Sequence, residues 1–176
     1  MLSKGVKMGN FVKIVVFGAL NAGKTTFLER ASKKKLSMKG SYEGMTTSLD
    51  FTQLKYNGKT VHLFTTPGHR RFDFMWEVLA KGMNGAILLI DSTVGITEVD
   101  REIEGLIESK SVPYVVAVNK SDLANLSLEI VREGLGISAK VPVIPTSAIY
   151  GKGVEEVFHR LMELENERRG TEQGIE

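Results

Sequence analysis

Gly18-Ala19-Leu20-Asn21-Ala22-Gly23-Lys24-Thr25 matches the pattern G-x-x-x-x-G-K-[ST] at every specified position. Residues 11–17 before it are mostly apolar and β-branched, which is typical of a buried strand, and residues 26–31 after it favour a helix. The glycines allow a tight turn, and the backbone N–H groups at the start of the helix point toward an anion. We therefore predict a phosphate-binding loop between a strand and a helix. The alternative is a glycine-containing connection without a ligand, which the flanking strand and helix disfavour.

The residues of this loop suit the chemistry of a nucleotide. Lys24 can reach the β- and γ-phosphates as a mobile positive charge, and the Thr25 hydroxyl can ligate Mg²⁺. The candidate backbone donors and side chains around the phosphates are Asn21, Ala22, Gly23, Lys24, Thr25 and Thr26.

Length and composition limit the remaining possibilities. The 176 residues suffice for one domain, and a formal net charge of +2 favours neither nucleic acid nor an anionic membrane as a partner. The chain has no cysteine, and its longest apolar runs, residues 86–90 and 114–118, are too short to span a bilayer. We expect a flexible lead over residues 1–10, one domain over 11–169, a flexible tail over 170–176, no direct membrane anchor and a cytoplasmic location.

Predicted strands and helices alternate along the chain. Asn57-Gly58 predicts a type I′ hairpin turn between extended residues 46–56 and 60–65. The other expected strands are residues 11–17, 86–91, 113–119 and 141–145, and the helices are 26–31, 71–81, 97–109, 126–135 and 154–167. This order predicts a three-layer α/β fold with a six-stranded, mainly parallel sheet that contains one antiparallel hairpin strand.

Polar clusters follow the ends of four predicted strands. They are the phosphate loop, Thr66-Pro67-Gly68-His69, Asn119-Lys120-Ser121-Asp122 and Thr146-Ser147-Ala148. Because ligands of parallel sheets bind at the carboxyl ends of the strands, we expect these loops to converge on one edge.

The cluster Asn119-Lys120-Ser121-Asp122 fits the pattern N-K-x-D, which indicates guanine binding. A carboxylate at Asp122 can accept from both N1–H and the 2-amino group of guanine, whereas adenine presents an acceptor at N1. Asn119 can brace the neighbouring loops, and the Lys120 stem can cover the ring. Ser147 lies in the adjoining loop, and the Ala148 N–H is a candidate donor to the guanine carbonyl.

In order and spacing, these motifs resemble those of the Ras-like small GTPases, over roughly residues 11–164. The segments 46–51 and 67–76 look most like the Arf-like and Ras-like GTPases of archaea and bacteria. The resemblance implies a P-loop G domain that binds GTP and GDP with Mg²⁺, hydrolyses GTP slowly and acts as a molecular switch. For some relatives it implies a roadblock-type regulator.

The metal-binding positions depart from the family pattern. A switch-loop threonine closes over Mg²⁺ and the γ-phosphate in this family; Thr46 and Thr47 both qualify, and the spacing to Asp50-Phe51 favours Thr46. The family's D-x-x-G motif reads Thr65-Thr66-Pro67-Gly68 here. Since a hydroxyl brings no charge, we expect Thr25 and Thr46 to hold the metal without the usual acidic helper, and Mg²⁺ coupling to be weakened.

The candidate catalytic residues are His69, Gly68 and Lys24. His69 stands where relatives carry a Gln or His that orients the attacking water, and the Gly68 N–H can bond the γ-phosphate. A turn histidine at the surface is the alternative for His69. The expected switch loop has no arginine, which favours a slow intrinsic rate and help from a partner.

Four functions remain in competition. A hydrolysing GTP switch leads, and a non-hydrolysing GTP/GDP-binding adaptor is the alternative because of Thr65. A nucleotide kinase would need a lid with several arginines, which this sequence does not show. A translation factor would need further domains. Residues 72–76 are a candidate surface for an unidentified regulator or effector, although we expect most of these side chains to be buried.

Overall fold

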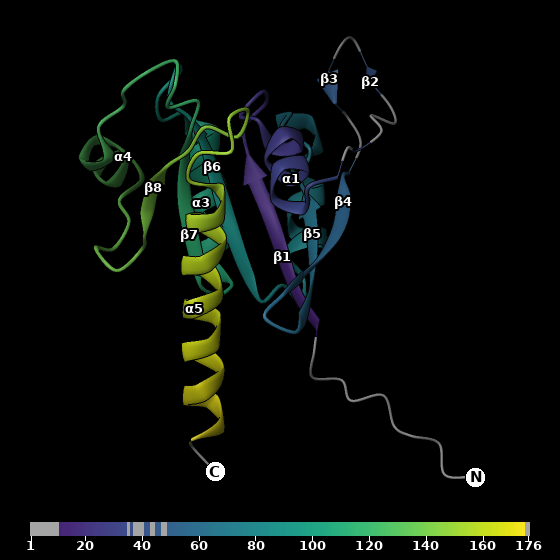
Figure 1. Cartoon of the computed structure of the whole chain (residues 1–176). Helices are drawn as coiled ribbons and strands as arrows, with labels where there is room; N and C mark the ends of the chain where they lie inside the picture. Colours follow the sequence, from purple (N-terminus) through teal and green to yellow (C-terminus); the bar gives the residue numbers. More distant parts are fainter. Residues whose placement is uncertain (1–10, 35, 37–40, 43–44, 47–48, 175–176) are drawn as a thin grey trace.

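The computed structural model describes residues 11–34, 36, 41–42, 45–46 and 49–174. Its central sheet has the strand order β4-β5-β1-β6-β7-β8, with helices on both faces (Figure 1). The strands are β1 (Phe11–Gly18), β4 (Phe51–Tyr56), β5 (Lys59–Thr65), β6 (Gly85–Asp91), β7 (Tyr114–Asn119) and β8 (Val143–Pro145). The helices are α1 (Lys24–Ser32), α2 (Phe74–Ala80), α3 (Glu98–Ser109), α4 (Leu128–Leu135) and α5 (Val154–Gln173).

The strand pairing confirms the predicted fold class. The β4–β5 pair is antiparallel, and every other pair in the central sheet is parallel. A separate antiparallel pair, β2 (Ser41–Tyr42) and β3 (Met45–Thr46), lies beyond the start of β4 (Figure 1).

Alternation along β1 divides the core into two apolar layers. Val12, Ile14 and Val16 pack with α1 and α5, whereas Val15 and Phe17 pack with α2, α3 and α4. Strands β6 and β7 are buried at every position, as expected for central strands covered on both faces. Among the described residues, no helix has the length and apolar character needed to cross a membrane.

The hairpin turn at Asn57-Gly58 sets the register of the sheet edge. Both residues have positive φ, 46° and 78°, as the type I′ turn requires. The register then runs from Tyr56 opposite Lys59 to Phe51 opposite Phe64. One further step places Asp50 opposite Thr65, at the point where the strands reach the site.

The segment after β5 differs from the single helix expected over residues 71–81. A 3-10 turn, η1 (Arg70–Phe72), precedes α2 and begins where the His69 ring accepts a hydrogen bond from the Arg71 N–H at 3.2 Å. The expectation that residues 72–76 are mostly buried is also wrong. Trp76 is buried, but the Phe74 side chain is 64% exposed because it faces away from the sheet side of this short helix.

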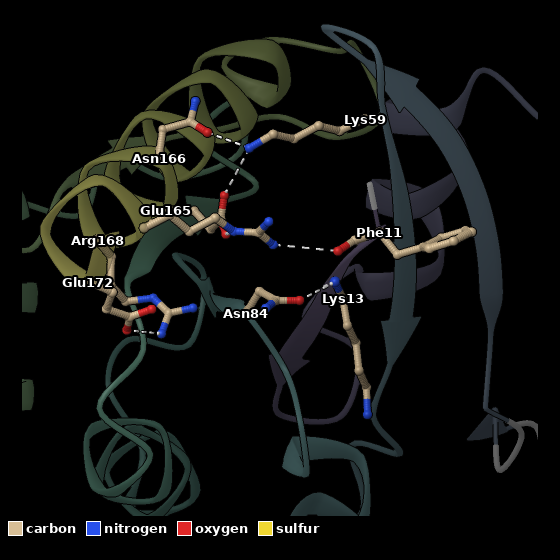
Figure 2. A network of polar contacts seen from close by, with 9 residues as sticks. Phe11, Lys13, Lys59, Asn84, Glu165, Asn166, Arg168 and Glu172 are labelled. Carbon is tan, nitrogen blue, oxygen red and sulfur yellow. Dashed lines mark hydrogen bonds and ion pairs between the residues drawn. The ribbon is translucent and has the colours of Figure 1, made fainter. Parts of the chain in front are cut away.

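Helix α5 continues well beyond the predicted end at residue 167. Its buried stripe ends on Glu165, which is fully buried and pairs with Lys59 at 3.3 Å and with Arg169. Arg169 also donates to the Phe11 carbonyl, so the last turns of α5 are tied to the start of β1 (Figure 2). The sequence interpretation missed the ion pair of Lys59 with Glu165, since a polar contact between distant segments does not form an apolar pattern.

Candidate nucleotide-binding site

A pocket of about 450 Å³ opens at the carboxyl ends of β1 and β5. Its lining joins the phosphate loop to both neighbouring strands and to the base motif: Leu20, Asn21, Gly23, Lys24, Thr25, Thr26, Glu29, Asp50, Thr65, Thr66, Gly68 and Lys120. Three of the four polar loops that the sequence placed after strands line this pocket, and the fourth, residues 146–148, contacts them through Asn119.

The phosphate loop takes its shape from Gly23, which precedes α1. Gly23 has a φ of 99°, and a Cβ at this position would collide with the amide of Asn119. The Gly23 carbonyl accepts the Phe27 N–H at 2.9 Å and so begins the helix. Only glycine satisfies both the backbone conformation and the close approach of the Asn119 side chain.

Lys24 lies folded back over its own loop. Its Nζ donates to the Gly18 and Ala19 carbonyls, each at 2.9 Å. Burial lowers the Lys24 pKa to about 8, while the nearby charges of Asp50 and Asp100 act in the opposite direction. A phosphate in the pocket would place a negative charge next to the buried Lys24 ammonium and so stabilise its charged form.

A carboxylate lies against Thr25, contrary to the expectation of a metal site without an acidic helper. Thr25 Oγ1 donates to Asp50 Oδ2 at 2.5 Å, and Asp50 is only 7% exposed. Thr65 does stand at the end of β5, where the sequence lacks an acid, but its Oγ1 accepts the Asp50 N–H at 3.1 Å. The hydroxyl and carboxylate oxygens here suit a hard cation such as Mg²⁺.

Gly68 packs closely against the phosphate loop. A Cβ on Gly68 would lie 2.7 Å from the Leu20 backbone and 2.7 Å from Lys24 Nζ, so this close approach requires glycine. Behind it, the buried Trp76 indole donates to the Pro67 carbonyl at 3.0 Å. This bond holds the connection between β5 and η1 against the body of the domain.

His69 is half-buried next to the pocket rather than in its lining. It borders a hollow of about 300 Å³ together with Ala19, Arg70, Asp91 and Asp100. A role in orienting water at the γ-phosphate would therefore require the ring to turn away from the Arg71 N–H. Its catalytic assignment stays a prediction.

Asn119 joins three loops at the base end of the site. Its Nδ2 donates to the Ala22 carbonyl at 2.8 Å, and its Oδ1 accepts from Thr146 Oγ1 at 3.2 Å and from the Ala148 N–H at 3.0 Å. Asn119 is 2% exposed, so these bonds are shielded from water. The Ala148 N–H, predicted to bond the guanine carbonyl, points here to Asn119, and its role toward a base remains a prediction.

The two other predicted base-binding residues of the N-K-x-D motif, Asp122 and Lys120, also contact side chains. Asp122 is exposed and accepts from Ser147 Oγ at 2.7 Å. Lys120 Nζ lies 2.6 Å from Asp91 Oδ2. Burial alone would raise the Asp91 pKa, but hydrogen bonds from Lys120 and Thr93 outweigh it and hold the pKa below its ordinary value.

Three residues that contact the site, Asp50, Arg30 and Asp91, were not predicted as site residues. Asp50 could have been found by continuing the hairpin register from Asn57-Gly58, which places it opposite Thr65. Arg30 donates to the Ala148 and Ile149 carbonyls. For Arg30 and Asp91 no local pattern exists, because their partners lie far away in the sequence.

Thr46 and Thr47 are the two candidates for the switch threonine. Thr46 ends the short strand β3, and its backbone pairs with Ser41. Thr47, the other candidate, lies outside the described residues. The choice between them stays a prediction.

Comparison with known sequences gives one family match. Residues 9–167 match the family described as the elongation factor Tu GTP binding domain. An uncharacterised protein of Methanocaldococcus jannaschii is 36% identical over 151 residues, which cover 86% of this chain and 95% of that protein. Translation initiation factor IF-2 of Kosmotoga olearia is 30% identical over 158 residues, 85% of this chain but only 23% of the factor.

Solved structures with the same fold include both large and small proteins. A bacterial selenocysteine-specific elongation factor matches with a TM-score of 0.73 and 19% identity, over 88% of this chain and 29% of that one. The small GTPase Arl6 of Trypanosoma brucei matches with a TM-score of 0.66 and 18% identity, over 89% and 98%. At these identities the likeness concerns the fold alone.

Proposed function

This chain belongs to the family of the elongation factor Tu GTP-binding domain, and from that premise we propose that it is a GTP/GDP molecular switch with slow, Mg²⁺-dependent hydrolysis. One observation supports this most strongly. The Asn119 amide donates to the Ala22 carbonyl at 2.8 Å, so the N-K-x-D loop and the phosphate loop are in direct contact. A guanine nucleotide bound here would contact the phosphate loop with its phosphates and the N-K-x-D loop with its base.

Each part of the site would act by position and charge. Lys24 and the loop N–H groups bind phosphate oxygens, and Asp122 selects guanine. Thr25, with Thr46, would hold Mg²⁺, which neutralises charge on the phosphates. Gly68 offers its N–H to the γ-phosphate, and His69 would orient the attacking water.

The function is tested by nucleotide binding and turnover. We expect GDP and GTP to bind in preference to ATP, and phosphate to be released over several turnovers in Mg²⁺. His69→Ala should slow release on the order of 100-fold without weakening GTP binding. His159→Ala is the matched control, because this exposed ring lies on α5, outside the site.

The alternative is a GTP/GDP-binding adaptor that does not hydrolyse. It is supported by the position of His69, which lines the neighbouring hollow and not the pocket itself. Tight GTP binding without phosphate release by the purified protein would favour the adaptor, whereas equal affinity for ATP and GTP would contradict both proposals.

A regulator or effector would bind beside the nucleotide. Phe74 and Val78 are 64% and 60% exposed and lie one turn apart on α2, which follows His69 and η1. A partner of the roadblock type, for which the family resemblance is the only argument, would be tested by GTP-dependent binding that Phe74→Ser abolishes.

A further inference from the structure

The contact between Thr25 and Asp50 has a geometry suited to a metal ligand. A threonine hydroxyl has one hydrogen and two lone pairs. When a cation takes a lone pair, the hydrogen must find an acceptor directed away from the cation. Asp50 Oδ2 is such an acceptor, 2.5 Å from Thr25 Oγ1.

Asp50 also brings the charge that Thr65 lacks. A carboxylate next to a ligand raises the basicity of that ligand, fixes its orientation and attracts the cation. Its remaining lone pairs can accept hydrogen bonds from metal-bound water. The carboxylate is 7% exposed, so this charge is little screened by solvent.

Thr65 holds Asp50 in place from two sides. The Thr65 N–H donates to the Asp50 carbonyl at 2.9 Å, and Thr65 Oγ1 accepts the Asp50 N–H at 3.1 Å. Thr65 is 1% exposed. The hydroxyl at the end of β5 is therefore a positioning group for the residue opposite it.

We infer that Asp50 is the acidic partner of Thr25 in magnesium binding, and that the carboxylate usual at the end of β5 has been replaced by one across the hairpin. The inference rests on the proposed binding of a magnesium nucleotide. It replaces the expectation of weakened metal coupling that Thr65 raised.

The test is the release of a fluorescent GDP analogue with excess Mg²⁺ and with EDTA. In the parent protein, Mg²⁺ should slow release strongly. Asp50→Asn keeps the backbone bonds to Thr65 and the side-chain size, and should reduce this slowing by about 10–100-fold, the usual effect of losing such a partner. Release in EDTA should change little.

A second substitution tests whether the charge can return across the hairpin. Thr65→Asp in the Asp50→Asn protein should restore most of the slowing by Mg²⁺. Asp73→Asn is the control, since that exposed carboxylate makes no capping bond at the start of α2. If Asp50→Asn fails to fold by circular dichroism, Asp50→Glu, whose carboxylate is displaced by one methylene, should show the same loss.

The outcomes separate the inference from the proposed function. A folded Asp50→Asn protein that retains the parent's ratio of release rates would overturn the inference, as would a double variant no better than Asp50→Asn. A parent protein that binds no GDP with or without Mg²⁺ would instead overturn the proposed function.

Discussion

The base end and the phosphate end of the site are held in different ways. At the base end, the Asn119 side chain bonds groups from two other loops, the phosphate loop and residues 146–148. At the phosphate end, Lys24 Nζ donates to the carbonyls of Gly18 and Ala19, and the Thr25 hydroxyl donates to Asp50. We infer that the base end is formed before a ligand arrives, whereas the phosphate end exchanges internal contacts for ligand contacts.

The largest expected effect comes from removing the centre of the base end. Asn119→Ala leaves the Ala22 carbonyl and the Ala148 N–H without this partner in a buried place. The free energy of unfolding should fall by on the order of 3 kcal/mol, measured by urea denaturation without nucleotide. Asn125→Ala, at an exposed position, is the control. Equal stability of the two variants would contradict a preformed base end.

A smaller effect, on specificity, is expected at Asp122. Asp122→Asn replaces one of two accepting oxygens by a donor and removes the charge, so GDP affinity should fall by about 10–100-fold with no comparable change for ADP. Calorimetric titration with both nucleotides measures this. A uniform loss for GDP and ADP would show that Asp122 supports the fold rather than reading the base.

The phosphate end should respond to pH through Lys24. Its pKa of about 8 in the empty pocket should rise when phosphates bind, because they favour the charged ammonium. Binding above pH 8 must therefore take up a proton, and GDP affinity should fall by up to about tenfold per pH unit. Below pH 8 this dependence should vanish.

Calorimetry in buffers of different ionisation enthalpy detects the proton directly. The Lys24→Met protein should bind GDP more weakly and should take up no proton on binding at pH 9. Affinity that is constant between pH 7.5 and 9.5 in the parent protein would contradict the lowered pKa.

The smallest expected effect lies where the two ends meet on α1. Arg30 holds the Ala148 and Ile149 carbonyls from the helix that follows the phosphate loop. Arg30→Met keeps the apolar stem but loses these bonds, and should cost about 1 kcal/mol of GDP affinity. The dissociation rate of GDP measures it, and an unchanged rate would show that Asn119 alone is sufficient.

The same contrast explains how far the sequence could predict the molecule. The fold followed from the apolar strands and the Asn57-Gly58 turn, which are local signals. The phosphate and base motifs also lie within single loops. The polar contacts between distant segments could not be read in this way. Examples are Glu165 with Lys59 and Arg30 with Ala148.

Asp50 falls between these two cases. Its position opposite Thr65 followed from the turn, but its side chain could not be assigned to Thr25 without the packing of α1 beside the hairpin. The substitution at residue 65 was visible in the sequence, whereas its compensation required three elements to be placed in space.

The bond from Trp76 to Pro67 gives the protein a built-in optical probe. Trp76 is the sole tryptophan of the chain, and its indole senses the carbonyl immediately before Gly68. If the Gly68 N–H bonds a γ-phosphate, as proposed, the polarity around the indole should change, and intrinsic fluorescence should then distinguish the GTP-bound from the GDP-bound protein without a label. The emission of the unmodified protein would then follow the proposed conversion of bound GTP to GDP over time.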